Sequence, residues 1–533
     1  MSMDRRLLLA DEAIAQGALD AGLSGAYAYP GTPSTEILEY IQRQAPAGVH
    51  CEWSANEKTA VEEALGMAYA GKRALVAMKH VGLNVAADPF VNSAITGVNG
   101  GLVVVAADDP SMHSSQNEQD SRFYADFALL PAIEPSSQQE AYATTRYAFD
   151  LSEKMRVPVL LRLTTRLAHS RADVTVDAPR AQNALALPDD PRQFVLLPAN
   201  ARRNYAALLA KQPALRQAAE NSDFNALTDG PDQSVGIIAC GLAINYVREA
   251  CDGAPSPHPM LKIVQYPLPE HLLRRLAEKC RTLLVIEDGM PFVESRLRGV
   301  LPHGWTIRGR LDGTLPYAGE LTPESVARAL GKPAAAVRAA SALVVPRPPG
   351  LCAACPHMDS FLFIKEAMAE HPGGRVFSDI GCYALGALPP LEAIASCVDM
   401  GASITMAKGA ADAGLRPSVA VIGDSTFTHS GMTGLLDAVY EKAPITLLIL
   451  DNGTTGMTGG QTSLGAGRLE AIVRGLGVEP KHLRVLAPLK KNHAANLKAL
   501  REELAYQGVS VILSQRECIQ TAKKRSGKHF HAI

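Results

Sequence analysis

The chain has 533 residues, 47% of them hydrophobic and 20% charged, and its 52 basic and 54 acidic side chains give a formal net charge of −2. This balance offers no electrostatic basis for binding a nucleic acid or an anionic membrane surface, and no apolar run reaches the roughly 20 residues of a membrane span. The N-terminal segment turns acidic after Leu9 and lacks a signal-peptide cleavage site, and nine cysteines argue against a secreted disulfide scaffold. We therefore expect a cytoplasmic α/β protein of about three domains.

Short apolar runs alternate with helical patterns along most of the chain, which is typical of parallel sheets covered by helices. We predict a first domain over residues 1–180, with strands at 25–29, 74–78, 102–106 and 157–162. The pattern loosens over residues 181–232, where proline, asparagine and aspartate surround one helix. This segment is predicted to be a linker region.

A smaller α/β domain is predicted over residues 233–345, with strands at 235–239, 262–264 and 283–287. A proline-rich stretch at 346–350 marks the next boundary, because prolines at that density favour extended backbone. The last domain, over residues 350–533, has strands predicted at 376–380, 418–422, 445–450 and 509–513. The first and last domains are similar in size and class, which hints at paired α/β domains with a site between them.

Two loops of the first domain carry candidate polar residues. Tyr29-Pro-Gly-Thr-Pro-Ser34 follows a predicted strand, and the hydroxyls of Thr32 and Ser34 are placed to bind a carboxylate. An ordinary strand-to-helix turn with Ser34 as the N-cap is the commoner explanation of such a loop. Lys79 and His80 also follow a predicted strand end.

A glutamate begins the apolar stripe of a helix predicted from residue 57. Glu57 shares one face with small and apolar residues, while the charged neighbours turn outward. The inward set is Ala60, Val61, Ala64 and Leu65, and the outward set is Lys58, Glu62 and Glu63. Ala60, Ala64 and Gly66 also predict a closely packed helix. From periodicity alone, Glu57 is more often a helix N-terminal charge than a buried functional acid.

The segment 418–461 is the most informative in the chain. It predicts a strand, a turn at Gly423-Asp424-Ser425, a helix, and a second strand followed by Asn452. Asp424 and Asn452 then lie at the carboxyl ends of parallel strands, where open sheets bind ligands. A carboxylate, an amide oxygen and a backbone carbonyl near Thr454 suit Mg²⁺ that also binds phosphate oxygens. The nearby glycines allow close approach of backbone N–H groups to a diphosphate.

Four cysteines are candidates for a metal site. Cys352 and Cys355 form a CxxC after the proline-rich stretch, and Cys382 and Cys518 each follow a predicted strand, on the same sheet edge as Asp424. Four thiolates there suit a 4Fe–4S cluster, and zinc accepts the same set. The remaining cysteines are predicted to be buried small residues, namely Cys51, Cys240, Cys251, Cys280 and Cys397. His529 and His531 near the end are better explained as part of a flexible terminus.

These motifs together resemble the thiamine diphosphate-dependent 2-oxoacid:ferredoxin oxidoreductases, and within them the large subunit of indolepyruvate ferredoxin oxidoreductase. The resemblance runs from Tyr29 to Cys518 and rests on the YP-x-TPS loop, the WS-x-NE segment, the run DN-x-TT-x-MTG, and the run CY-x-LG-x-LPP. Ser425 stands where the thiamine diphosphate motif has its second glycine. Ala353-Ala354 and Met358 stand where indolepyruvate subunits usually carry Pro-Gly and Arg.

The resemblance implies a thiamine diphosphate-binding fold of two doubly wound parallel-sheet domains with a smaller α/β domain between them. It assigns Glu57 to activate the cofactor, Thr32 to contact the substrate carboxylate, and His80 to face the oxoacid. It places the diphosphate and its Mg²⁺ on Gly423, Asp424, Ser425, Asn452, Thr454, Gly456, Met457 and Thr458, with Asp424, Asn452 and Thr454 holding the metal. A redox-active 4Fe–4S cluster is assigned to Cys352, Cys355, Cys382 and Cys518.

The implied reaction is oxidative decarboxylation of a 2-oxoacid, expected to be an arylpyruvate such as indolepyruvate, to an acyl-CoA. Indolepyruvate large subunits continue into a ferredoxin-like domain, whereas this sequence ends at Ile533 without its cysteine runs. We therefore expect CoA as co-substrate, a smaller β subunit, and a separate ferredoxin or similar acceptor as partners. The basic stretch at 523–525 is a candidate docking point, although a solvated end explains it better. The alternatives are a non-oxidative thiamine diphosphate-dependent decarboxylase and a catalytically silent assembly subunit.

Overall fold

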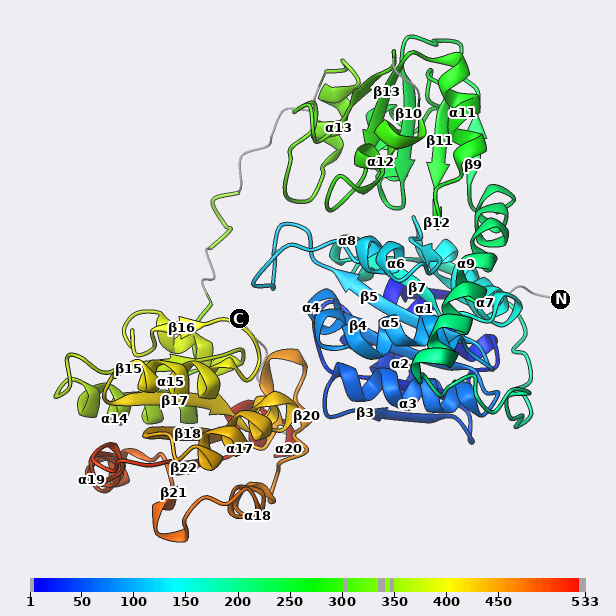
Figure 1. Ribbon diagram of the computed structural model, residues 1–533. Helices are drawn as coiled ribbons and strands as arrows, with labels where there is room; N and C mark the ends of the chain where they lie inside the picture. The colour runs from blue at the N-terminus through cyan, green and yellow to red at the C-terminus, as the bar shows by residue number, and fades with distance from the viewer. Residues whose placement is uncertain (1–3, 302–303, 334–340, 346–348, 527–533) are drawn as a thin grey trace. The chain divides into compact units, whose positions relative to one another are not determined.

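The computed structural model describes residues 4–301, 304–333, 341–345 and 349–526, which fall into two compact units, Met1–Arg338 and Ala339–Ile533. Helices and mainly parallel sheets build both units (Figure 1), so the predicted α/β class is confirmed. Each predicted strand overlaps an observed one, with ends displaced by one or two residues. Among the described residues, no helix has both the length and the apolar character needed to cross a membrane.

The first unit contains a seven-stranded sheet. Its order is β12-β6-β7-β5-β4-β2-β3, and only β12 runs antiparallel to its neighbour. The strands are β2 (Gly25–Ala28), β3 (His50–Trp53), β4 (Ala74–Lys79), β5 (Leu102–Asp108), β6 (Ala132–Ile133), β7 (Val159–Thr164) and β12 (Gln265–Tyr266). Strands β2, β4, β5 and β7 are buried along their whole length, as expected for parallel strands covered on both faces.

Two apolar clusters cover the two faces of this sheet. One contains residues of α1 (Ala10–Asp20), α2 (Thr35–Gln44) and α7 (Gln138–Met155), and the other those of α3 (Glu57–Tyr69), α5 (Ala87–Thr96) and α9 (Pro198–Glu220). Helix α1 crosses α7 so closely that a Cβ on Gly17 would stand 2.6 Å from the carbonyl oxygen of Tyr142. The doubly wound arrangement follows from strands that are apolar on both sides.

The strand order of this sheet indicates where a ligand is expected to bind. The chain leaves β2 for β3 on one side and then returns to β4 on the other, so the direction of winding reverses between β2 and β4. Open α/β sheets bind ligands outside the carboxyl ends of the strands at such a reversal. The loops that follow β2 and β4 are the two segments predicted to carry Thr32 and His80.

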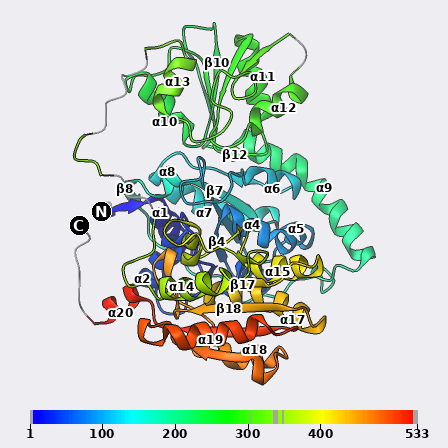
Figure 2. The ribbon, with the colours of Figure 1, turned by 90° about the vertical axis from the view of Figure 1, so that its left-hand side faces the viewer.

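The first unit also contains a five-stranded sheet in the order β14-β13-β10-β11-β9, whose central strand β10 is labelled in Figure 2. The strands of this sheet are β9 (Ala226–Thr228), β10 (Gly236–Cys240), β11 (Met260–Ile263), β13 (Thr282–Ile286) and β14 (Thr306–Arg308). The 181–232 segment contains α9, which buries Leu208 and Leu215, and it also supplies β9. The domain boundaries at residues 180, 232 and 345 stay predictions.

A buried arginine joins the two sheets of the first unit. Arg162 on β7 donates to Asp108 at 2.6 Å, to Glu134 at 2.7 Å and to the carbonyl oxygen of Asp288 at 2.9 Å. Arg162 is 2% exposed and Glu134 is 4% exposed. Because Asp288 follows β13 and Arg162 lies on β7, this guanidinium ties the smaller sheet to the larger one.

Replacing Arg162 with Met is expected to lower the free energy of unfolding of the first unit by about 3–5 kcal/mol, because three polar partners lose their donor in a buried site. Urea denaturation followed by circular dichroism measures the change. Arg180→Met is the matched control, because Arg180 pairs with Asp150 on the surface at 2.5 Å and an exposed pair contributes about 0–1 kcal/mol. Equal effects of the two substitutions would contradict the prediction.

The second unit is built on a six-stranded sheet in the order β16-β15-β17-β18-β22-β21, with every neighbouring pair parallel. The strands are β15 (Arg375–Ser378), β16 (Ser396–Cys397), β17 (Ser418–Gly423), β18 (Ile445–Asp451), β21 (Leu483–Leu486) and β22 (Ser510–Gln515). Helices α14 (Pro356–Met368) and α19 (His493–Leu504) pack on one face, and α15 (Ala402–Asp412), α17 (Met432–Tyr440) and α18 (Leu469–Gly475) pack on the other. The winding reverses between β15 and β17, so the loops after these strands flank the second crevice position.

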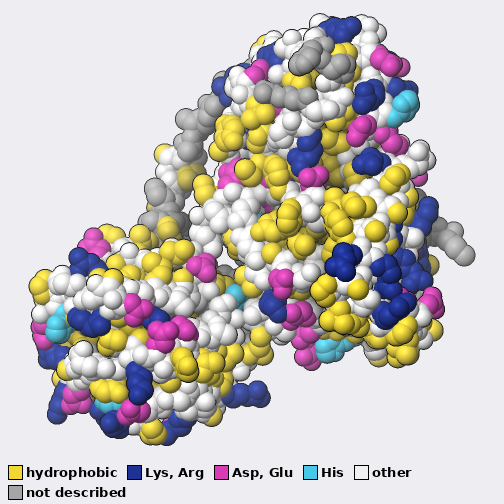
Figure 3. Space-filling model, in the orientation of Figure 1, with side chains coloured by type: hydrophobic (Ala, Val, Ile, Leu, Met, Phe, Trp, Pro, Cys, Tyr) yellow, Lys and Arg dark blue, Asp and Glu magenta, His cyan; other side chains and the backbone are white. Residues whose placement is uncertain are grey.

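Charged side chains of both signs are interspersed over the face of the molecule in Figure 3. The formal net charge of −2 agrees with this mixture. Lys and Arg side chains gather at the lower right of that view, while Asp and Glu side chains are scattered over both units.

Candidate active site

The loop after β2 is held by its own hydrogen bonds. The Ser34 hydroxyl donates to the carbonyl oxygen of Gly31 at 2.7 Å, and the amide of Gly31 donates to the Thr35 hydroxyl at 3.1 Å. Ser34 occupies the N-cap position of α2, as the turn explanation predicts, but its side chain makes no capping hydrogen bond. Its hydroxyl is instead used to close the turn that presents the half-buried Thr32.

The loop after β4 lies directly against this turn. A Cβ on Gly31 would stand 3.2 Å from the Cβ of Lys79, so the two loops touch at the reversal between β2 and β4. The Lys79 ammonium donates to the carbonyl oxygen of Ser114 at 2.9 Å, and burial lowers the pKa of Lys79. The candidate substrate residues of the first unit thus converge at the expected place on the sheet.

His80 is the first residue of α4 (His80–Val85) and is 1% exposed. Its Nε2 lies 3.1 Å from the side-chain oxygen of Asn117, in the loop after β5. Its Nδ1 is buried without a hydrogen-bond partner among the described residues. A buried ring nitrogen without a partner is available to form a hydrogen bond with a polar atom of a ligand.

Glu57 begins α3 as predicted, with the Asn56 side chain accepting from the amide of Thr59 at 2.9 Å to cap the helix. Glu57 is 5% exposed, and the inward and outward faces match the predicted periodicity. Gly66 differs, because it is exposed and a Cβ there would meet nothing within 4 Å. The prediction that Gly66 serves close packing is therefore wrong, and only the alanines of this helix do so.

Gly82 on α4 lies against the carboxyl group of Glu57. A Cβ on Gly82 would stand 2.6 Å from Cγ and 2.6 Å from Oε1 of Glu57. A Cβ atom does not come this close to another heavy atom. Only glycine at position 82 therefore leaves the Glu57 carboxyl group in its observed place. Gly82 was not predicted as a site residue, because no local sequence pattern indicates that it contacts Glu57.

In the second unit, Asp424 follows β17 and is 2% exposed. Its Oδ2 atom accepts no hydrogen bond from any described residue. Burial, reinforced by the charge of Asp451, raises the pKa of Asp424 to about 7. A carboxylate oxygen that accepts no hydrogen bond is available as a ligand for a divalent cation. Asp424 therefore fits a role as a ligand of Mg²⁺.

Asn452 follows β18 and is fixed by two contacts. Its side-chain oxygen accepts from the amide of Thr454 at 3.0 Å, and its side-chain nitrogen lies 3.1 Å from Nε2 of His357. Burial lowers the pKa of His357 to about 4, so this imidazole is neutral at pH 7 and its Nε2 accepts the hydrogen bond. His357 therefore orients the Asn452 amide. This role was not predicted from the sequence, although His357 directly follows the CxxC motif and Pro356.

The glycine-rich segment forms a small hairpin between β19 (Thr454–Thr455) and β20 (Gln461–Thr462). Ser425 meets it through its hydroxyl, 2.9 Å from that of Thr455. Gly456 and Met457 are exposed, and Thr458 donates to the side chain of Gln461 at 2.8 Å. Lys524 donates to the carbonyl oxygen of Gly459 at 3.0 Å. This lysine of the basic stretch therefore packs on the hairpin and does not lie in a free end.

The four candidate cysteines come together at the same edge of the sheet. Burial, together with the nearby thiols of Cys355, Cys518 and Cys352, raises the pKa of Cys382 to about 12. The amide of Cys518 donates to the carbonyl oxygen of Asn452 at 3.1 Å. Neighbouring thiolates repel one another, so these thiols lose their protons easily only when a cation binds among them. The four cysteines therefore fit a metal centre.

The other cysteines differ in part from the prediction. Cys240, Cys251 and Cys280 are buried as expected, whereas Cys51 is only half-buried and Cys397 is exposed. Cys397 lies on the short edge strand β16, where the sheet has no further neighbour to cover it. His529 and His531 lie outside the described residues.

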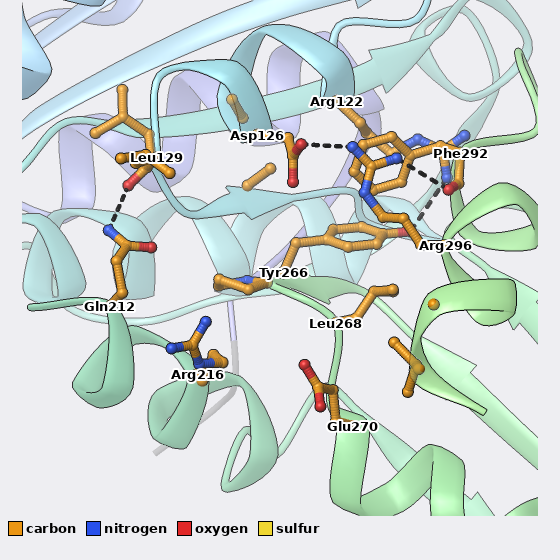
Figure 4. A pocket seen from close by; sticks show the side chains of 16 residues that line it. Arg122, Asp126, Leu129, Gln212, Arg216, Tyr266, Leu268, Glu270, Phe292 and Arg296 are labelled. Atoms are coloured by element: carbon orange, nitrogen blue, oxygen red, sulfur yellow. Dashed lines mark hydrogen bonds and ion pairs between the residues drawn. The ribbon is translucent and has the colours of Figure 1, made fainter. Parts of the chain in front are cut away.

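A cavity of about 300 Å³ in the first unit is separate from these residues (Figure 4). It lies beside Arg122, Tyr266, Phe292 and Arg296, and none of the predicted site residues lines it. The guanidinium of Arg296 stacks on the Phe292 ring at 3.6 Å and pairs with Asp126 at 2.5 Å. Arg122 and Arg296 in the wall of this cavity are both paired with carboxylates, and we assign the cavity no part in the site.

Comparisons with known proteins agree with this geometry. Residues 16–225 match the family described as "Pyruvate flavodoxin/ferredoxin oxidoreductase, thiamine diP-bdg", and residues 379–512 match "Thiamine pyrophosphate enzyme, C-terminal TPP binding domain". The "Indolepyruvate oxidoreductase subunit IorA" of Archaeoglobus fulgidus is 40% identical over 98% of this chain and 89% of its own length. That of Thermococcus kodakarensis is 39% identical over 97% of this chain and 86% of its own. The chain belongs to the IorA family of indolepyruvate oxidoreductase subunits.

The predicted resemblance and enzyme class are thereby confirmed: this IorA-family chain is a subunit of a thiamine diphosphate-dependent 2-oxoacid:ferredoxin oxidoreductase. A solved structure supports the fold. The 2-oxoglutarate:ferredoxin oxidoreductase from Magnetococcus marinus, with 2-oxoglutarate, coenzyme A and succinyl-CoA bound, superposes with a TM-score of 0.50 at 17% identity, over 62% of this chain and 65% of that one. Glu57, Thr32 and His80 fall within the first matched family, and Asp424 and Asn452 fall within the second.

Proposed function

We propose that this IorA-family chain catalyses the oxidative decarboxylation of an arylpyruvate such as indolepyruvate. The 2-oxoacid and CoA give an acyl-CoA, CO₂, one proton and two electrons, which pass through an iron–sulfur cluster to a ferredoxin or a similar acceptor. The names of the curated relatives support the arylpyruvate. The observation that carries the redox chemistry is the gathering of four thiols beside Asn452, at the edge where Asp424 also lies.

Both units carry residues for the proposed chemistry. Thiamine diphosphate, when bound, supplies the carbon nucleophile and the electron sink that decarboxylation of a 2-oxoacid requires. Asp424, Asn452 and the backbone of Thr454 would hold its Mg²⁺, and the exposed hairpin at Gly456–Thr458 offers backbone N–H groups to the diphosphate. Glu57 would exchange a proton with the aminopyrimidine ring, a task for which its burial is suited.

The substrate residues lie on the loops after β2 and β4. Thr32 would donate its hydroxyl to the substrate carboxylate, and the unpartnered Nδ1 of His80 would meet an oxygen of the oxoacid. The four cysteines would hold the cluster, which accepts single electrons where zinc cannot. A redox centre beside the cofactor thus favours iron over zinc for this cysteine set.

We further propose that the chain works with a smaller β subunit that completes the thiamine pocket. The purified chain alone is then expected to reduce a viologen dye with indolepyruvate and CoA at only a small fraction of the rate of the two-subunit complex. A full rate for the chain alone would contradict this part of the proposal.

Replacing His357 with Leu is expected to lower the Mg²⁺ affinity of the thiamine diphosphate complex by about 10–100-fold, the usual cost of losing an outer partner of a metal ligand. The physical reason is that the Asn452 amide loses its only side-chain acceptor among the described residues. Isothermal titration of Mg²⁺ in the presence of thiamine diphosphate measures the change. His357→Gln should restore part of the affinity, because its side-chain oxygen accepts a hydrogen bond.

His493→Leu is the control for this substitution, since His493 lies on α19 and contacts Glu366 on the surface at 2.7 Å. It should leave the Mg²⁺ affinity unchanged. An unaltered affinity in His357→Leu would show that Asn452 does not depend on His357.

The substrate class is tested by a panel of 2-oxoacids. With the two-subunit complex, CoA and a viologen dye, indolepyruvate and phenylpyruvate are expected to give the highest kcat/KM. A preference for pyruvate or 2-oxoglutarate would contradict the arylpyruvate assignment and leave the oxidoreductase class untouched.

A further inference from the structure

Three segments of the first unit meet behind the substrate loop that carries Thr32. Strand β1 (Asp4–Leu9) pairs antiparallel with β8 (Arg171–Val176), and Leu9 stands opposite Arg171. This pairing places the start of α1 beside the end of α8 (Thr165–Ala168). The first turn of α2, which follows the loop directly, completes the group.

Each segment contributes one potential metal ligand. Asp11 lies in the first turn of α1, Glu36 in the first turn of α2, and His169 directly after α8. One ligand atom of each lies within 4.8 Å of the other two, and Glu36 Oε2 is 3.7 Å from His169 Nε2. The three side chains therefore surround a common point.

Asp11 is a buried carboxyl group without hydrogen bonds to the part of the chain that the structure describes. It is 0% exposed, and neither of its carboxylate oxygens has a hydrogen-bond partner among the described residues. Glu36 Oε2 has none either. Burial and the charge of Glu36 raise the pKa of Asp11 well above its usual range. Asp11 is fully buried and Glu36 is partly exposed, and a buried carboxylate beside a second carboxylate is stabilised by a proton or a cation between them.

The donor set distinguishes a cation from a proton. A shared proton would use only the two carboxyl groups, whereas here an imidazole joins them as a third ligand. Two carboxylate oxygens and one imidazole nitrogen suit a divalent transition-metal ion such as Zn²⁺ or Mn²⁺, with water completing the shell. The side chains of Glu36 and His169 are 35% and 36% exposed, which leaves a path for the ion and room for that water.

We propose that Asp11, Glu36 and His169 bind a divalent transition-metal ion at a site separate from the thiamine diphosphate corner. The ion would tie together α1, α2 and the segment after α8. Because Glu36 lies only two residues beyond Ser34, it would fix the end of the loop that presents Thr32. Its role would be structural, since none of the three ligands is among the residues assigned to the cofactor or the substrate.

The test uses the holoenzyme with its thiamine diphosphate, Mg²⁺ and iron in place, equilibrated with Mn²⁺ and then freed of excess metal. Bound manganese is counted by mass spectrometry, and pulsed electron paramagnetic resonance detects nitrogen from a coordinating imidazole. We expect wild-type protein to hold one more equivalent of Mn²⁺ than Asp11→Asn or His169→Gln. The imidazole signal should be present in the wild type and absent in His169→Gln. Manganese that replaces Mg²⁺ at Asp424 would give no such signal, because that ligand set has no histidine.

Glu39→Gln is the matched control, because Glu39 lies on α2 one turn from Glu36 and outside the cluster. It should retain both the extra equivalent and the imidazole signal. Equal manganese content in all variants without an imidazole signal would overturn the proposal and leave a shared proton between Asp11 and Glu36. Both readouts are independent of turnover, so this outcome would not affect the proposed function.

Discussion

Replacing Glu57 with Gln is expected to lower turnover of the two-subunit complex by about 10²–10⁴-fold, the range that a positioned general acid or base contributes. Gln keeps the size of the side chain and its place at the start of α3, but it neither gives nor takes a proton at pH 7. The fold should be unaffected, because the buried face of α3 is formed by Ala60, Val61 and Ala64. Viologen reduction with indolepyruvate and CoA measures the loss, and thermal unfolding checks the fold.

Two further variants sharpen this prediction. Glu62→Gln removes an exposed carboxylate from the same helix and should retain wild-type turnover. Gly82→Ala leaves Glu57 in the chain but places a methyl group 2.6 Å from its carboxyl oxygen, so the carboxyl must move and turnover should fall. Near-wild-type activity in Glu57→Gln would remove Glu57 from the proposed role.

Replacing Cys382 with Ala is expected to remove the iron–sulfur cluster, with a loss of about four iron atoms per chain. Cys382 is the thiol whose pKa is raised by burial and then by all three of the other candidate cysteines, so it lies at the centre of the set. Reduction of the acceptor should fall to background, since no other electron carrier is proposed in this chain. Iron analysis and the visible absorption of the anaerobically purified protein measure the loss.

Cys397→Ala is the matched control for the cluster, because Cys397 is exposed on β16 and its thiol contacts only the carbonyl oxygen of Asp379, at 3.6 Å, among the described residues. It should retain the iron and the activity. Unchanged iron in Cys382→Ala, or equal loss in the two variants, would contradict the proposed ligand set.

The strand ends were predictable from the sequence because they depend on local patterns. Buried strands of a parallel sheet are continuous apolar runs, and the polar residue that ends a run lies at the carboxyl edge. Asp424 and Asn452 were placed at one edge for this reason, and the structure shows them at the ends of β17 and β18. The 3.6-residue period placed Glu57 on the apolar face of α3, but periodicity alone favoured a helix N-terminal charge, and the family resemblance was needed to predict a buried acid.

Contacts between distant segments were not predictable from one sequence. The approach of Gly82 to Glu57, of His357 to Asn452, and of Asp11 to Glu36 and His169 each depends on how helices cross the sheets. Ser34 lies at the N-cap position of α2 as expected, but its hydroxyl donates to the carbonyl oxygen of Gly31 and makes no capping hydrogen bond to the helix. Cys397 was expected to be buried because cysteine usually is, and its place on an edge strand is a property of the sheet order.

The most direct test of the account is the cofactor content of the two-subunit complex, purified without oxygen and supplied with indolepyruvate and CoA. Iron, sulfide and thiamine diphosphate are assayed on the same sample in which viologen reduction is followed. The account predicts about four irons and one bound thiamine diphosphate per IorA-family chain, with dye reduction that requires both substrates. Bound thiamine diphosphate with no iron, and CO₂ release without dye reduction, would contradict it.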